Sequence, residues 1–71
     1  MLVKVNATAL AEKREAKKLS QHKLSILSGL SSASIFRMEN ELHKVSDLRV
    51  KAVATVLGCS PDELITEEEP T

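Results

Sequence analysis

Apolar residues recur at helical spacing in two short stretches between residues 21 and 40. The spacing predicts two helices, whose inward side chains are Leu24, Ile26, Leu27, Ile35 and Met38. Gly29 separates the stretches, and glycine tolerates the left-handed backbone that ends a helix. Ser31 can then cap the second helix by accepting a backbone N–H. The pattern predicts a helix, a tight turn and a helix within about 20 residues.

Helices are also expected on both sides of this unit. Asn6 or Thr8 can cap an earlier helix, which we expect to end at about Lys17. A later helix begins at Ser46 or Asp47, after a loop. Its core stripe follows the i, i+3, i+4, i+7 rule and consists of Val50, Val53, Ala54 and Leu57.

The end of the chain predicts a fifth, one-turn helix. Ser60 can cap it, and Pro61 suits the first helical position. Residues 2–5 are β-prone but need a partner, and residues 64–66 are the only other plausible strand. The two segments are expected to form a short β-pair between the chain ends, unless the N-terminus is frayed. The expected fold is therefore all-α with five helices.

Length, charge and cysteine content limit the class of protein. The 71 residues allow one domain, which we assign to residues 1–66, followed by an acidic tail at 67–71. Residues 1–57 hold all ten Lys and Arg with five acidic residues, whereas residues 58–71 hold five acidic residues and no basic one. This asymmetry fits a nucleic-acid surface on one side, although charges can also simply solvate a small protein. A single cysteine and no long apolar run favour a cytoplasmic protein.

Three segments in order, REAKKLSQHKL, SGLSSASIFRMEN and VLGCSPDELI, resemble the lambda-repressor-like (Cro/cI-type, or XRE) helix-turn-helix family. The resemblance covers residues 10–65. It implies a five-helix bundle that binds double-stranded DNA sequence-specifically, usually as a homodimer. Glu41 departs from the family, which usually has glycine after the equivalent of Asn40. Because glutamate disfavours positive φ, the turn at this point is expected to differ.

Four residues on the second helix of this unit are expected to contact bases: Ser32, Ala33, Phe36 and Arg37. Serine can bond to several base edges, and Ala33 and Phe36 can touch a thymine methyl group. The guanidinium fork of Arg37 matches guanine O6 and N7, or it reaches a phosphate. Phe36 is the single aromatic residue, and it either faces DNA or turns inward to the core.

Phosphate contacts are expected from Gln21, Lys23, Ser34, Asn40, His43 and Lys44. Gln21 stands at a helix N-terminus, where free N–H groups and the helix dipole favour an anion. The resemblance also implies a structural pair between Arg14 and Glu39 that bridges two helices.

A second apolar stripe, formed by Leu48, Ala52, Val56 and Cys59, is expected to be a homodimer interface, although it can also be ordinary core. No cofactor, metal site or enzyme activity is expected, because two His and one Cys lack zinc-site spacing.

These features favour a bacterial or phage transcriptional regulator, namely a cytoplasmic, nucleoid-associated repressor that binds an inverted repeat as a homodimer. RNA polymerase or an antirepressor could be a further partner. The alternative is a protein-interaction module on the same fold, such as an antirepressor or antitoxin.

Overall fold

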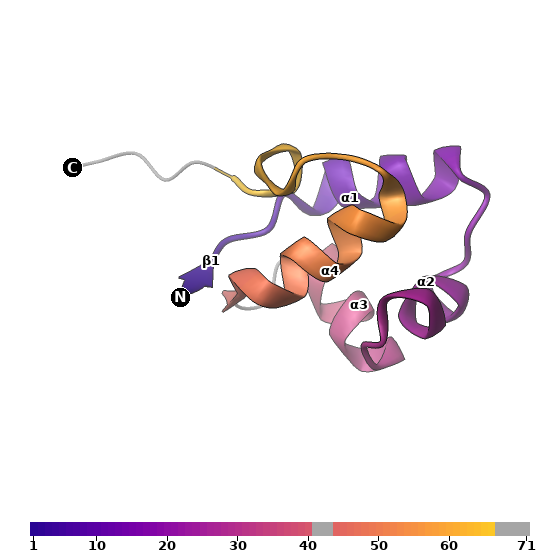
Figure 1. The fold of residues 1–71 in the computed structure, drawn as a ribbon, viewed down its shortest axis with the longest axis horizontal. Coiled ribbons are helices and arrows are strands. Elements are labelled where there is room, and N and C mark those ends of the chain that lie inside the picture. The colour runs from indigo at the N-terminus through magenta and orange to yellow at the C-terminus, as the bar shows by residue number, and fades with distance from the viewer. Residues whose placement is uncertain (41–43, 67–71) are drawn as a thin grey trace.

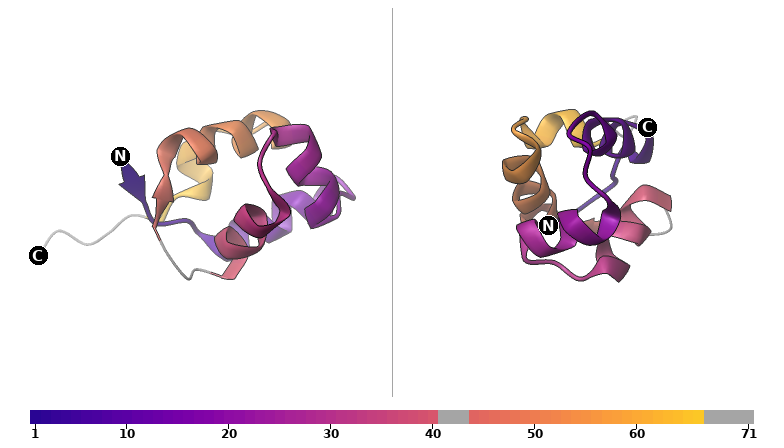
Figure 2. Two further views of the ribbon diagram at one scale, coloured as in Figure 1. Left: turned by 90° about the horizontal axis from the view of Figure 1, so that it is seen from below. Right: turned by 90° about the vertical axis from the view of Figure 1, so that its right-hand side faces the viewer.

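The computed structural model describes residues 1–40 and 44–66 of the chain. Four α-helices lie in this part: α1 (Ala7–Ala16), α2 (Gln21–Ser28), α3 (Ser32–Asn40) and α4 (Asp47–Leu57). A 3-10 turn, η1, follows at Pro61–Leu64, and two short strands are β1 (Leu2–Val3) and β2 (Val45–Ser46). Figures 1 and 2 show α1 and η1 along one edge of the molecule, and α2 with α3 along the opposite edge.

The fifth helical segment is a single 3-10 turn. The described part of the chain therefore has four α-helices, and the prediction of five helices is wrong. Its cap nevertheless has the predicted chemistry, because Ser60 Oγ accepts the N–H of Asp62 at 3.2 Å. In return, Glu63 Oε2 accepts the N–H of Ser60 at 2.9 Å, which completes a capping box. The turn cannot lengthen into an α-helix because Ile65 is already extended and forms a bridge with Val5.

The caps of the other helices follow local side-chain chemistry. Asn6, rather than Thr8, caps α1, and Ser20 and Ser46 cap α2 and α4. Ser31 Oγ accepts the N–H of Ser34 at 3.1 Å at the beginning of α3. The left-handed residues Gly29 and Gly58, with φ of 78° and 71°, end α2 and α4.

The β-pairing differs in part from the prediction. Val5 does bridge Ile65, and the N–H of Thr66 donates to the carbonyl of Lys4 at 2.8 Å, so the chain ends meet as expected. However, β1 pairs antiparallel with β2, which lies in a segment predicted to be loop. The side chain of Val45 is buried in the core. This burial explains why residues 45–46 pack beside β1.

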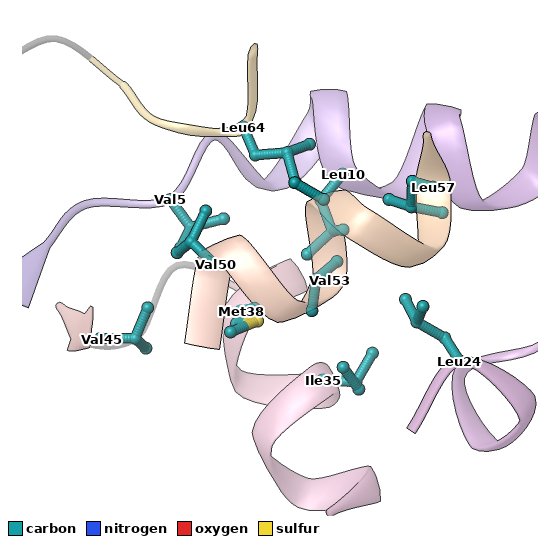
Figure 3. Packing of buried hydrophobic residues seen from close by; sticks show 11 residues of the cluster. Val5, Leu10, Leu24, Ile35, Met38, Val45, Val50, Val53, Leu57 and Leu64 are labelled. Carbon is teal, nitrogen blue, oxygen red and sulfur yellow. The ribbon is translucent and has the colours of Figure 1, made fainter. Parts of the chain in front are cut away.

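One hydrophobic core joins all four helices (Figure 3). It consists of Val5, Leu10, Leu24, Ile35, Met38, Val45, Val50, Val53, Ala54, Leu57 and Leu64. The predicted inward stripes of α3 and α4 are confirmed.

The inward stripe of α2 is corrected. Ile26 and Leu27 were expected inside, but their side chains are 59% and 50% exposed. The eight-residue helix instead buries Leu24 and Ser25. Ser25 tolerates burial because its hydroxyl is hydrogen-bonded to the carbonyl of His22 at 2.6 Å. Two large apolar side chains therefore remain on the outer surface of α2.

None of the helices within residues 1–40 and 44–66 is long and apolar enough to cross a membrane.

Candidate nucleic-acid interface

The turn between α2 and α3 fixes how α3 is presented. Gly29 takes the left-handed conformation, and the N–H of Leu30 donates back to the carbonyl of Ser25 at 3.1 Å. A Cβ on Gly29 would meet nothing within 4 Å, so its φ of 78°, and not crowding, favours glycine here. Ile35 and Met38 then anchor α3 to the core, which leaves its opposite face exposed.

The outer face of α3 contains the residues expected to contact bases. Ser32, Ala33, Phe36 and Arg37 are all exposed. The side chain of Phe36 is 52% exposed, so the alternative in which it turns into the core is wrong. Within the part of the chain that the structure describes, Arg37 forms no ion pair. Its charge is thus available to a ligand.

A buried ion pair holds α3 against α1. Arg14 Nε lies 2.6 Å from Glu39 Oε2, and Arg14 Nη2 lies 3.2 Å from Glu39 Oε1. The two side chains are 13% and 6% exposed. Arg14 Nη1 also donates to the carbonyl of Leu19 at 2.6 Å. The hydrogen bond to Glu39 raises the pKa of Arg14, against the opposing effect of burial. The pair is bidentate and ties the end of α3 to the bundle.

The side chain of Gln21 is also directed at Glu39. Its Nε2 donates to Glu39 Oε1 at 3.0 Å. The backbone remains available, because the first intrahelical bond of α2 joins the N–H of Leu24 to the carbonyl of Ser20 at 2.9 Å. Gln21 can therefore offer a phosphate its backbone N–H, while its amide serves the ion pair.

The other expected phosphate contacts are spread more widely. Lys23 is exposed on α2, and Asn40 Nδ2 donates to the carbonyl of Phe36 at 2.7 Å. Ser34 accepts a hydrogen bond from Ser31 Oγ at 3.1 Å. Lys44 lines a shallow pocket with Leu2, Val3, Lys4, Ile65 and Thr66, beside the chain ends. His43, with Glu41, lies outside the described residues, as does the acidic segment 67–71.

Sequence reasoning missed a hydrogen-bonded cluster between α2 and α3. Ser25 Oγ lies 3.2 Å from Ser32 Oγ, and His22 Nδ1 lies 3.3 Å from the same Ser32 oxygen. The spacing of His22 and Ser25, three apart on one helix, was a weak signal. Nothing in the sequence showed that Ser32 would meet them across the turn.

The expected dimer stripe on α4 is only partly exposed. The side chain of Leu48 is 69% exposed, whereas Val56 and Cys59 pack partly against the core. Burial raises the pKa of the Cys59 thiol. Leu2, which is 65% exposed, pairs with Ser46 just before α4. Exposed apolar side chains therefore lie at the beginning of α4 and on β1, as well as on α2 and α3.

Among the described residues, no three His, Cys, Asp or Glu side chains form a group that could hold a metal ion.

Two helices joined by a left-handed glycine, with the second helix anchored behind and exposed in front, define a helix-turn-helix domain. The helix-turn-helix family model HTH_3 matches residues 10–64, and the chain belongs to this family. A comparison with curated proteins gives no match.

Solved structures give the same fold. The restriction-modification controller protein C.AhdI from Aeromonas hydrophila is 37% identical, with a TM-score of 0.76 over 80% of this chain and 86% of that one. The clp gene regulator ClgR from Corynebacterium glutamicum is 24% identical, with a TM-score of 0.73 over 80% of this chain and 61% of that one. A variant of hydroxyethylphosphonate dioxygenase is 19% identical, with a TM-score of 0.80 over 94% of this chain and 14% of that one. The last two similarities concern the fold alone.

Proposed function

We propose that this helix-turn-helix protein is a transcriptional regulator that binds an inverted-repeat DNA operator as a homodimer and represses by occupying it. The observation that carries the proposal is the exposed face of α3, which is fixed from behind by Ile35, Met38 and the buried Arg14–Glu39 pair. A short rigid helix with a free outer face fits the major groove. C.AhdI, a controller protein by name, supports a regulatory role.

The chemistry of the α3 face suits base recognition. Arg37 has no acidic partner in the described structure, so its fork can bind guanine O6 and N7. Ala33 and Phe36 supply apolar surface for a thymine methyl group. Ser32, one turn before Phe36, supplies a hydrogen-bonding group at the beginning of the helix.

Phosphate contacts would position α3 in the groove. We assign them to the N–H groups at the beginning of α2, to Lys23 and to the polar residues Ser34, Asn40, His43 and Lys44. Each neutralised phosphate releases counterions, so affinity should fall steeply as salt rises.

The dimer would place two α3 helices on one face of the DNA. Leu48 and Ala52 on α4, with the adjacent Leu2, provide the contact, and Val56 and Cys59 extend it toward the core. Two-fold symmetry of the protein then requires two inverted half-sites about one helical turn apart.

Selection from random double-stranded DNA, followed by salt titration on the selected site, tests this function. We expect an inverted repeat to be enriched and Arg37→Ala to weaken binding by about fivefold or more, since a good guanine contact contributes about 1–3 kcal/mol. Lys17→Ala is a control that removes the same charge. The side chain of Lys17 lies beside Gly58 at the end of α4 and not on α3. Equal losses in the two variants, or no enriched sequence, would contradict base reading by α3.

A protein-interaction module is the second candidate, favoured by the exposed side chains of Ile26, Leu27 and Phe36. The double variant Arg37→Ala with Lys23→Ala separates the two functions. It should abolish DNA binding but leave an apolar protein contact intact. If Phe36→Ala no longer binds a partner protein but binds DNA as the unaltered chain does, this second function is favoured.

A further inference from the structure

Three side chains at the junction of α2 and α3 form a hydrogen-bond chain that reaches the DNA-facing surface. Ser25 Oγ lies 2.6 Å from the carbonyl oxygen of His22 and 3.2 Å from Ser32 Oγ. His22 Nδ1 lies 3.3 Å from that same Ser32 oxygen. Ser25 is 4% exposed, whereas Ser32 is exposed on α3. The chain thus connects a buried hydroxyl to a surface hydroxyl.

The direction of these bonds follows from counting protons. A carbonyl oxygen can only accept, so Ser25 donates its single hydroxyl proton to the carbonyl of His22. Ser25 Oγ has no second proton, and it can therefore only accept from Ser32. The one proton of Ser32 is consequently used inside the protein.

His22 leads to the same result in either tautomer. If Nδ1 carries a proton, it donates to Ser32 Oγ, and one lone pair of that oxygen remains. If Nδ1 is unprotonated, the proton of Ser32 goes either to Ser25 or to His22. In both cases Ser32 has no proton for a partner outside the protein, but it can still accept one.

Building on the proposed function, in which α3 reads base edges, we infer that Ser32 acts in the major groove only as a hydrogen-bond acceptor, and that Ser25 and His22 are the positioning residues that set this polarity. The base donors in the major groove are the amino groups of adenine N6 and cytosine N4, whereas guanine and thymine present acceptors. Ser32 therefore selects adenine or cytosine at the base that it faces. A serine with a free proton would bond to either kind of edge.

The position that Ser32 faces is first identified as the half-site position at which Ser32→Ala loses its base preference. Affinity is then measured for four duplexes, each with a different base at that position. The unaltered chain should prefer adenine or cytosine by about fivefold, the effect of one hydrogen bond. The double variant Ser25→Ala with His22→Ala removes both internal partners of Ser32 and so frees its proton. It should reduce this preference to about twofold or less by improving binding to guanine or thymine.

Ser28→Ala is the matched control. Ser28 Oγ donates to the carbonyl of Ser25 at 3.3 Å, so the variant loses the same type of bond on the same helix without a recorded contact to Ser32. Its base preference should equal that of the unaltered chain. In addition, a second duplex carries the preferred base without its amino group. The unaltered chain should bind this duplex about fivefold more weakly than the complete one, whereas Ser32→Ala should bind the two duplexes equally well.

A preference for guanine or thymine at this position, or no effect of the missing amino group, would overturn the inference. Because the amino-group measurement uses the unaltered chain, it decides the matter even if the double variant of Ser25 and His22 does not fold. If these results occur while Arg37→Ala still weakens operator binding, the proposed function stands without the inference. If the unaltered chain selects no sequence, both are overturned.

Discussion

At the scale of single residues, Glu39 is the point at which three helices are joined by side chains. Its carboxylate accepts from two nitrogens of Arg14 on α1 and from Nε2 of Gln21 on α2, while its backbone belongs to α3. The carboxylate thus accepts three hydrogen bonds inside the protein. Glu39 does not touch the outer face of α3, but it determines how that face is held.

Glu39→Ala should strongly destabilise the fold. The substitution leaves the guanidinium of Arg14 with low exposure and without its main partner, which costs about 3–5 kcal/mol. For a domain of this size, that loss lowers the melting temperature by more than about 10 °C. Thermal unfolding followed by circular dichroism measures the effect.

Glu15→Ala is the control for this prediction. Its carboxylate also approaches Arg14, at 3.8 Å, but its side chain is 70% exposed, and exposed pairs contribute at most about 1 kcal/mol. Equal melting temperatures for the two variants would refute a stabilising role for the buried pair.

The limits of sequence reasoning are also clearest at single residues. Ile35 and Met38 could be placed in the core because helical spacing fixes the face on which they lie. The hydrogen bond from the Gln21 amide to Glu39, a residue 18 positions away, was not predicted. Such contacts depend on the rotamers of side chains from different helices, which periodicity does not encode.

At the scale of elements, short-range chemistry was predictable, whereas long-range pairing was predicted only in part. The bridge between Val5 and Ile65 was expected, but the partner of β1 was not. The caps at Asn6, Ser20 and Ser60 depend on hydrogen bonds that reach three residues or fewer. The partner of β1 depends on which of two distant segments fits beside it. Two-residue strands contain too little pattern to decide this, so the pairing of Leu2 with Ser46 could not be predicted.

Glu63→Gln should destabilise the end of the chain in a pH-dependent manner. The N–H of Ser60 and then the ammonium of Lys13 hold the pKa of Glu63 below the ordinary glutamate value. A carboxyl whose pKa is lowered by folding contributes stability above its unfolded pKa and loses it as pH falls through the folded pKa.

Thermal unfolding at neutral pH and at about pH 2 measures this dependence. The variant should melt below the unaltered chain at neutral pH, and the two should converge in acid. Glu12→Gln is the control, because the carboxylate of Glu12 makes no ion pair within residues 1–40 and 44–66. A difference that persists unchanged in acid would show that the loss comes from packing and not from charge.

At the scale of the whole molecule, α2 and α3 present exposed cationic side chains together with exposed apolar ones, which are Ile26, Leu27 and Phe36. Lys23 and Arg37 on α2 and α3 have no ion pair in the described part of the chain, whereas Lys13 is paired with Glu63 beside η1. The net charge of zero therefore gives no indication of how the surface is divided.

Leu48→Glu should separate dimer formation from folding. The side chain of Leu48 is 69% exposed, so a charge there costs the isolated fold little, but burial of an unpaired carboxylate in an interface opposes association. Sedimentation should show a dimer for the unaltered chain and a monomer for the variant, with an unchanged melting transition of the monomer. Ile26→Glu on α2, where the side chain is 59% exposed, is the control and should remain dimeric.

The same pair of variants links assembly to DNA binding. A dimer gains its second half-site contact within one complex, so a monomeric Leu48→Glu should lose affinity for the complete inverted repeat and bind it about as weakly as an isolated half-site. The affinity of the unaltered chain for the complete site should exceed its affinity for the half-site. If Leu48→Glu retains both the dimer and the preference for the complete site, the two-fold contact lies away from the beginning of α4.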